Sequence, residues 1–154
     1  MLFVHGSPNS QQEYLLPDMN AFAALERVET AGAETLFCGH THRPYVRELS
    51  EGSIRVSVKK DGNYPDIEQE MTLPMRRIVN AGSVGEPRHG STKATYVVHD
   101  DDSGVVRVRE VEYDISKTCR AIVEAGLAEV FAWRLSYGFE YAERAEDASH
   151  VCER

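Results

Sequence analysis

The sequence predicts a mixed α/β protein, with α+β character, built from layers of sheet and helix. Three observations predict it. Short apolar runs ending at glycines flank a helical segment within residues 1–39, a series of strand patterns follows over residues 45–113, and two short helical segments close residues 116–137. This order is typical of a layered α/β protein rather than a helical bundle or a simple sandwich. With 154 residues, 42% of them hydrophobic, the chain can build one compact core.

The first third predicts a strand, a helix and a second strand. Residues 2–5 form an apolar run that stops at Gly6-Ser7-Pro8. Asn20 can cap a helix that runs to about Thr30 and ends before Gly32. The apolar face of this helix is expected to carry Phe22, Leu25 and Val28. Residues 35–38 then form a second short buried strand.

The remainder predicts further strands and then two helices. Strands are expected over 45–49, 53–58 and 77–80, a polar loop over 59–73, and a hairpin of strands 94–99 and 105–113 around Asp101–Gly104. The two helices are expected from Ser116, as a cap, to Gly126, and over 129–137 before Gly138. We expect residues 1–140 to form one domain and residues 141–154 to be a charged, frayed tail.

Composition excludes several classes of protein. The formal charge of −8 argues against non-specific binding to nucleic acid, which needs a basic face. No apolar run is long enough to cross a membrane, and the first residues lack a secretory pattern, so a cytoplasmic location is the expectation. Three widely spaced cysteines suggest neither a disulfide framework nor a zinc knuckle, and Cys38 is expected to be a packed side chain.

Histidines follow the two predicted N-terminal strands. His40 and His42 lie directly after residues 35–38, and His5 ends the first apolar run. If the two strands are parallel neighbours, their carboxyl ends share one rim, which brings the three imidazoles together. Imidazole suits divalent ions of the Zn, Fe or Mn type. An isolated HxH pair is more often a solvated turn, but three imidazoles at one sheet edge are hard to explain as packing.

A third loop follows strand 77–80. The segment Asn80–Arg88 contains glycines that allow a tight turn, and either Arg88 or the backbone N–H groups around Gly82 and Ser83 could face an anion. The alternative interpretation is an ordinary strand-ending turn with a surface arginine.

In combination, the blocks at residues 5–8, 39–42 and 80–88 resemble the last conserved blocks of the calcineurin-like metallophosphoesterases. The match is closest to a small prokaryotic branch of phosphodiesterase and diadenosine-tetraphosphatase-like proteins, and it extends to about residue 138. The resemblance implies two facing mixed sheets flanked by helices, with two divalent metal ions at the strand ends. It implies that His5 and His40 ligate one ion and His42 the other. It also implies that a metal-bound hydroxide hydrolyses a phosphodiester or phosphomonoester, with Gly82, Ser83 and Arg88 on the substrate side.

The family's first-half motifs are missing from this sequence. No DxH, GDxxD or GNH block is present, so neither the bridging aspartate nor the catalytic histidine is supplied. Two dications about 4 Å apart repel each other strongly, and three neutral imidazoles carry no charge to offset this. We therefore expect the first half of the fold to be missing, through a fragment, a misplaced start or a split gene. The chain alone should bind at most one metal ion, weakly, and be nearly inactive.

The expected partners follow from the same resemblance. They are a phosphorylated small molecule or nucleotide as substrate, and either a chain that supplies the missing N-terminal half or a second copy of this chain. Two rival functions remain open. One is a non-catalytic remnant or binding subunit that keeps the fold, and the other is a single-metal binding protein that uses only the histidines.

Overall fold

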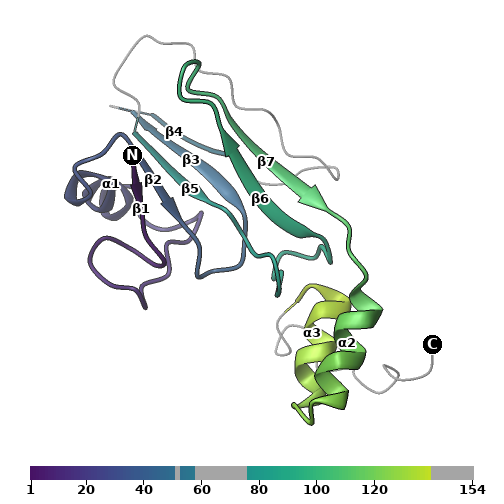
Figure 1. The fold of residues 1–154 in the computed structure, drawn as a ribbon. Helices are drawn as coiled ribbons and strands as arrows, with labels where there is room; N and C mark the ends of the chain where they lie inside the picture. Colours follow the sequence, from purple (N-terminus) through teal and green to yellow (C-terminus); the bar gives the residue numbers. More distant parts are fainter. Residues whose placement is uncertain (51–52, 58–75, 140–154) are drawn as a thin grey trace.

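Five strands form the central sheet of this computed structural model, which describes residues 1–50, 53–57 and 76–139. Their order is β1 (Leu2–Phe3), β2 (Thr35–Cys38), β5 (Arg76–Asn80), β3 (Tyr45–Ser50) and β4 (Ser53–Ser57) (Figure 1). Strands β1, β2 and β5 are parallel, and β3 runs antiparallel to both β5 and β4. The parallel pairing of the first two strands, the condition for the three histidines to share one rim, is therefore met.

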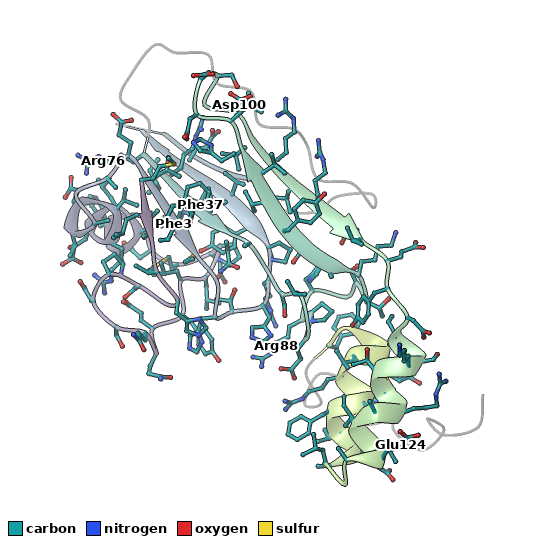
Figure 2. The ribbon with its side chains drawn as sticks, in the orientation of Figure 1. Phe3, Phe37, Arg76, Arg88, Asp100 and Glu124 are labelled. Atoms are coloured by element: carbon teal, nitrogen blue, oxygen red, sulfur yellow. The ribbon has the colours of Figure 1, made fainter. Side chains whose placement is uncertain are left out.

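A two-stranded hairpin covers one face of this sheet. Strands β6 (Ala94–His99) and β7 (Val106–Val111) pair antiparallel and lie across the sheet in Figure 1. An apolar cluster joins the two layers: Phe37, Val46 and Val79 from the sheet, and Val97, Val106 and Val108 from the hairpin. Figure 2 shows Phe37 beside Phe3 of β1, and their rings stack with centroids 4.7 Å apart. Burial on both faces explains why β2 reads as a continuous apolar run rather than an alternating one.

Helix α1 (Ala21–Thr30) covers the other face. Asn20 caps it as predicted, because its Oδ1 accepts hydrogen bonds from the N–H groups of Phe22 and Ala23 at 2.9 and 3.4 Å. The predicted apolar face is wrong at Phe22, whose side chain is 83% exposed. Ala24 and Val28, which are spaced i and i+4, face the sheet instead. A step of four residues leaves two side chains about 40° apart around the helix axis, so Ala24 and Val28 share a face. The six-residue step from Phe22 to Val28 leaves their side chains far apart around the axis.

The last two helices form a pair at one end of the sheets. Helix α2 (Ile115–Glu124) lies beside α3 (Glu129–Tyr137) in Figure 1. The cap of α2 is Asp114, which accepts a hydrogen bond from the N–H of Lys117 at 2.9 Å. The prediction of Ser116 as the cap is therefore wrong, because the Asp114 carboxylate, two residues earlier, accepts the hydrogen bond from the first turn of the helix. Gly138 ends α3 with a φ of 70°, as predicted.

The structure confirms a mixed α/β architecture with facing sheets and flanking helices. The predicted loop 59–73 and the predicted frayed tail 141–154 lie outside the described residues. Each helix of the described chain has ten residues or fewer, and none combines the length and apolar character needed to span a membrane.

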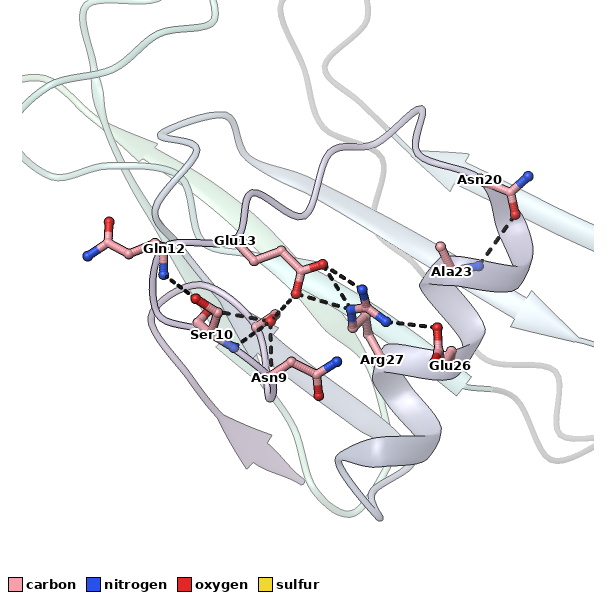
Figure 3. Close-up of polar contacts among 9 residues, drawn as sticks. Asn9, Ser10, Gln12, Glu13, Asn20, Ala23, Glu26 and Arg27 are labelled. Atoms are coloured by element: carbon pink, nitrogen blue, oxygen red, sulfur yellow. Dashed lines mark hydrogen bonds and ion pairs between the residues drawn. The ribbon is translucent and has the colours of Figure 1, made fainter.

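Two contacts hold the long connection between β1 and α1 in place. The Tyr45 hydroxyl donates a hydrogen bond to the Leu15 carbonyl at 2.7 Å, inside the core. Arg27 of α1 forms a two-pronged hydrogen bond with the Glu13 carboxylate, which the buried Ser7 hydroxyl also contacts (Figure 3). The hydrogen bond from Arg27 is the main reason that the pKa of Glu13 lies below its ordinary value. The connection that follows His5 is thus anchored at both ends.

Candidate metal centre

Three loops meet at the carboxyl ends of the three parallel strands. Hydrogen bonds extend the strand pairing into these loops, from the Gly39 N–H to the His5 carbonyl and from the Ala81 N–H to the Cys38 carbonyl, both at 3.0 Å. His5, the turn 39–42 and the loop 80–88 therefore open from the same end of the sheet, as the rule for parallel sheets predicts.

His5 and His40 are in direct contact. Nε2 of His5 lies 3.0 Å from Nδ1 of His40, and the ring centroids are 4.7 Å apart. Two nitrogens that each bind one ion at about 2.05 Å, and lie this far apart, subtend an angle of about 95° at the ion. That angle is acceptable for neighbouring ligands of one first-row metal ion. The pair consequently fits the prediction that His5 and His40 ligate the same ion.

Backbone strain is concentrated at the two neighbouring histidines. His40 has a φ of 62° and His42 a φ of 57°, and they are the non-glycine residues of the described chain with positive φ. A left-handed conformation costs a residue with a Cβ on the order of 1–2 kcal/mol. Such strain persists only where the surroundings enforce it, and it gathers at functional sites. The turn holds both imidazoles in place at a cost in stability.

The buried side chain of Asn80 enforces this turn. Its Nδ2 donates to the Gly39 carbonyl at 2.7 Å and to the Thr41 hydroxyl at 2.9 Å. Its Oδ1 accepts from the Gly82 N–H at 2.9 Å. Asn80 is fully buried at the end of β5. One amide therefore ties the histidine turn to the loop 80–88.

His42 is oriented from the opposite loop. Its Nδ1 lies 2.6 Å from the carbonyl oxygen of Glu86. A carbonyl can only accept, so Nδ1 carries the hydrogen, which in the neutral imidazole leaves the lone pair on Nε2. The backbone N–H of Arg88 donates a hydrogen bond to the backbone carbonyl of His42 at 3.2 Å. This arrangement is the usual one for a metal-binding imidazole, whose second nitrogen donates to a carbonyl or carboxylate.

Of the three predicted substrate residues, Arg88 contacts His42, through its backbone N–H. Arg88 donates to the Glu86 carboxylate at 3.3 Å, and Figure 2 shows it between the sheets and the helix pair. The N–H groups of Gly82 and Ser83 donate to Asn80 Oδ1 and Thr95 Oγ1. Because those two N–H groups already donate hydrogen bonds within the protein, an anion would have to bind to other groups of the loop. Contact of these residues with substrate stays a prediction.

The three predicted metal ligands are arranged as a pair and a single residue. Over residues 1–50, 53–57 and 76–139, no group of three or more His, Cys, Asp or Glu side chains is arranged to hold a metal ion. His5 and His40 make a two-nitrogen pair, and His42 is held separately against Glu86. Burial raises the pKa of the Cys38 thiol to about 12, so this nearby sulfur stays protonated at neutral pH and is a core side chain, as expected.

Three residues of the site carried no signal in the sequence. Tyr14 stacks on His40 with ring centroids 4.3 Å apart, although it lies in the loop before α1. Glu86 lies within the loop 80–88, where a glutamate gives no sign in the sequence of the contacts it makes. Arg134 of α3 reaches the Glu86 carboxylate at 3.0 Å across 48 residues of sequence. A loop tyrosine and a helical arginine are common surface residues, so only their contacts mark them.

Comparison with known proteins gives the same family. Residues 1–104 match the family model described as the calcineurin-like phosphoesterase superfamily domain. An uncharacterized protein of Methanocaldococcus jannaschii is 33% identical over 140 residues, which are 90% of this chain and 51% of that protein. A UDP-2,3-diacylglucosamine hydrolase of Shewanella piezotolerans is 36% identical over 52 residues, 34% of this chain and 22% of the hydrolase.

Solved structures extend this likeness to the fold. The crystal structure of a metallophosphoesterase from Sphaerobacter thermophilus superposes with a TM-score of 0.73 and 30% identity, covering 88% of this chain and 54% of that one. A hypothetical protein from Pyrococcus horikoshii shares the fold with a TM-score of 0.63 and 24% identity. The superposition covers 90% of this chain and 46% of the P. horikoshii chain. The chain thus spans about half the length of its M. jannaschii relative. Together with the family model, these likenesses show that the chain belongs to the calcineurin-like phosphoesterase superfamily.

Proposed function

We propose that this chain supplies the nitrogen ligands His5, His40 and His42 to a divalent-metal phosphoesterase that hydrolyses phosphodiesters or phosphomonoesters. The observation that carries the proposal is the turn 39–42. It holds one histidine 3.0 Å from His5 and keeps two histidines in a strained left-handed conformation. Family membership supports the reaction class.

The residues of the chain have separate roles in this proposal. His5 and His40 bind one ion of the Mn, Fe or Zn type, and His42 presents its Nε2 to a second. When bound, such ions supply the positive charge that polarises a phosphoryl oxygen and make water a nucleophile at neutral pH. Arg88, whose guanidinium carries five N–H donors, orients the phosphoryl group of a phosphorylated small molecule or nucleotide.

We further propose that the complete site takes its remaining ligands from polypeptide outside these 154 residues. Three neutral imidazoles provide no negative charge between two dications, and the sequence holds no DxH, GDxxD or GNH block. The chain also covers about half of its relatives. Alone, it should bind at most one ion per chain, weakly, and turn over slowly.

Metal stoichiometry and hydrolysis of an aryl phosphodiester with added Mn²⁺ test the proposal together. For the chain alone we expect no more than one ion and little turnover. We expect turnover to appear when a polypeptide carrying the missing acidic and histidine blocks is added. The variant His40→Ala should lose the bound ion, whereas His99→Ala in the hairpin should keep it. Two ions with robust turnover by the chain alone would contradict the proposed incompleteness.

Two alternatives share one observation in their favour. The absence of a three-ligand group among the described residues also suits a binding subunit that keeps the fold without turnover, or a protein that binds one ion through the histidines. Metal binding without turnover, even after the missing blocks are added, would favour these functions over the enzyme.

A further inference from the structure

The C-terminal helix pair reaches the candidate metal centre through one side chain. Nη1 of Arg134, in α3, donates to Oε1 of Glu86 at 3.0 Å. Helix α3 lies beyond the 104 residues that match the family model. The contact therefore joins a peripheral element to a loop of the site.

Glu86 is the point where this contact meets His42. Its backbone carbonyl accepts the Nδ1 hydrogen of His42, and its carboxylate lies 3.8 Å from the same nitrogen. The carboxylate is also contacted by Arg88 at 3.3 Å. Both Glu86 and His42 have side chains that are 25% exposed, so the group is screened only in part from solvent.

His42 needs such support because its own backbone does not favour its position. Its φ of 57° is a strained conformation that the surroundings must enforce. At Glu86 the opposing loop is held by a hydrogen bond from the Glu86 N–H to the Ser83 hydroxyl at 2.8 Å, by the buried Pro87 that follows, by the hydrogen bond from the Arg88 backbone N–H to the His42 carbonyl, and by the side-chain clamp. The Arg134 guanidinium is itself held over the Phe131 ring, 5.9 Å from its centroid.

We propose that Glu86 and Arg134 are positioning residues that fix the His42 imidazole with hydrogen on Nδ1 and the lone pair on Nε2 available to a metal ion. Outer hydrogen-bond partners of metal-binding histidines set the tautomer and the ring orientation in this way. Arg134 anchors the Glu86 carboxylate, which holds the Glu86 carbonyl against Nδ1. The importance of His42 for metal binding rests on the proposed function, but its tautomer does not.

The experiment reads the His42 tautomer in metal-free protein by two-bond ¹H–¹⁵N NMR, with His42→Gln used to assign the signals. The parent should show one form, with hydrogen on Nδ1. Arg134→Met should bring in the form with hydrogen on Nε2, and Arg134→Lys, which keeps a cation near Glu86, should restore the parent pattern. Arg120→Met removes an exposed arginine of the neighbouring helix and should change nothing.

Cobalt binding supplies the second measurement. In protein completed by a polypeptide that carries the missing blocks, Arg134→Met should weaken binding of the Co²⁺ ion that His42 ligates about tenfold or more, as loss of an outer hydrogen-bond partner does. If Arg134→Met does not fold, as judged by a thermal melt, Glu86→Gln breaks the charge pair from the other side and should give the same mixture of tautomers. A parent-like tautomer in the folded variants would overturn the inference. Failure of the parent itself to bind Co²⁺ would instead count against the proposed function. The tautomer measurement would then decide the inference about Glu86 and Arg134.

Discussion

The buried amide of Asn80 should be among the most costly side chains to remove from this protein. Asn80→Ala deletes three hydrogen bonds to oxygen or nitrogen, with the Gly39 carbonyl, the Thr41 hydroxyl and the Gly82 N–H, at 2.7, 2.9 and 2.9 Å, and a weaker one to Cys38 Sγ at 3.5 Å. Each of the first three is worth about 1 kcal/mol net, so we expect a loss of about 3 kcal/mol in the free energy of unfolding. That is a large part of the roughly 5–15 kcal/mol that stabilises an ordinary domain.

Urea denaturation followed by circular dichroism measures this loss, with Asn9→Ala as the matched control. Asn9 is exposed, and only its backbone N–H is used, to Ser7 Oγ, so its substitution should cost less than about 0.5 kcal/mol. Since Asn80 holds both residues that flank His40, the variant should also bind Co²⁺ more weakly than the parent. A cost below about 1 kcal/mol for Asn80→Ala would refute the view that this amide enforces the histidine turn.

Three further outcomes are expected, each read by urea denaturation. His40→Gly should be more stable than His40→Ala by about 1 kcal/mol, because both lose the imidazole but only glycine accepts the positive φ; equal stability would mean that this turn is unstrained. Gly82→Ala should cost about 2–4 kcal/mol, since an added Cβ would overlap Thr95 Oγ1 at a positive φ, whereas Gly126→Ala, at a similar φ with open space around it, should cost about 1 kcal/mol. The pKa of Glu13 lies below its ordinary value in the folded state. The ionised carboxylate therefore contributes fully to the free energy of unfolding above the unfolded pKa of about 4.3, and this contribution is lost as pH falls through the folded pKa. The stability gap between the parent and Glu13→Gln should therefore hold from pH 7 down to about pH 5 and shrink only at lower pH; a gap that closes above pH 5 would show that the carboxylate is not stabilised by folding.

Much of the site could be read from strand patterns and their ends. His5 and His40 each follow a short apolar run, and the parallel pairing of those runs brings the two rings into contact. The rule that parallel strands open at their carboxyl ends was sufficient for this prediction. The cap at Asn20 and the end of α3 at Gly138 were predictable for a similar reason, because each depends on local backbone chemistry.

The errors arose where side chains competed for one role. Phe22 is apolar and lies on a plausible helical face, yet Ala24 and Val28 occupy the sheet side and leave it in solvent. Ser116 is a good capping residue, but Asp114 lies nearer to the free N–H groups of the first turn. Periodicity and residue preference identify candidates for a role, and packing chooses among them.

The amino-acid sequence alone settles the order of strands and helices, the three loops that carry histidines and Arg88, and the resemblance to the calcineurin-like phosphoesterases. These follow from short-range patterns of apolar residues, glycines and caps, which act within a few residues. The fold alone settles that Tyr14 stacks on His40, that Asn80 ties two loops together, and that Arg134 reaches Glu86 across 48 residues. Such contacts join residues far apart in the chain, and no local preference specifies them, because they exist only after the sheet and the helices have packed.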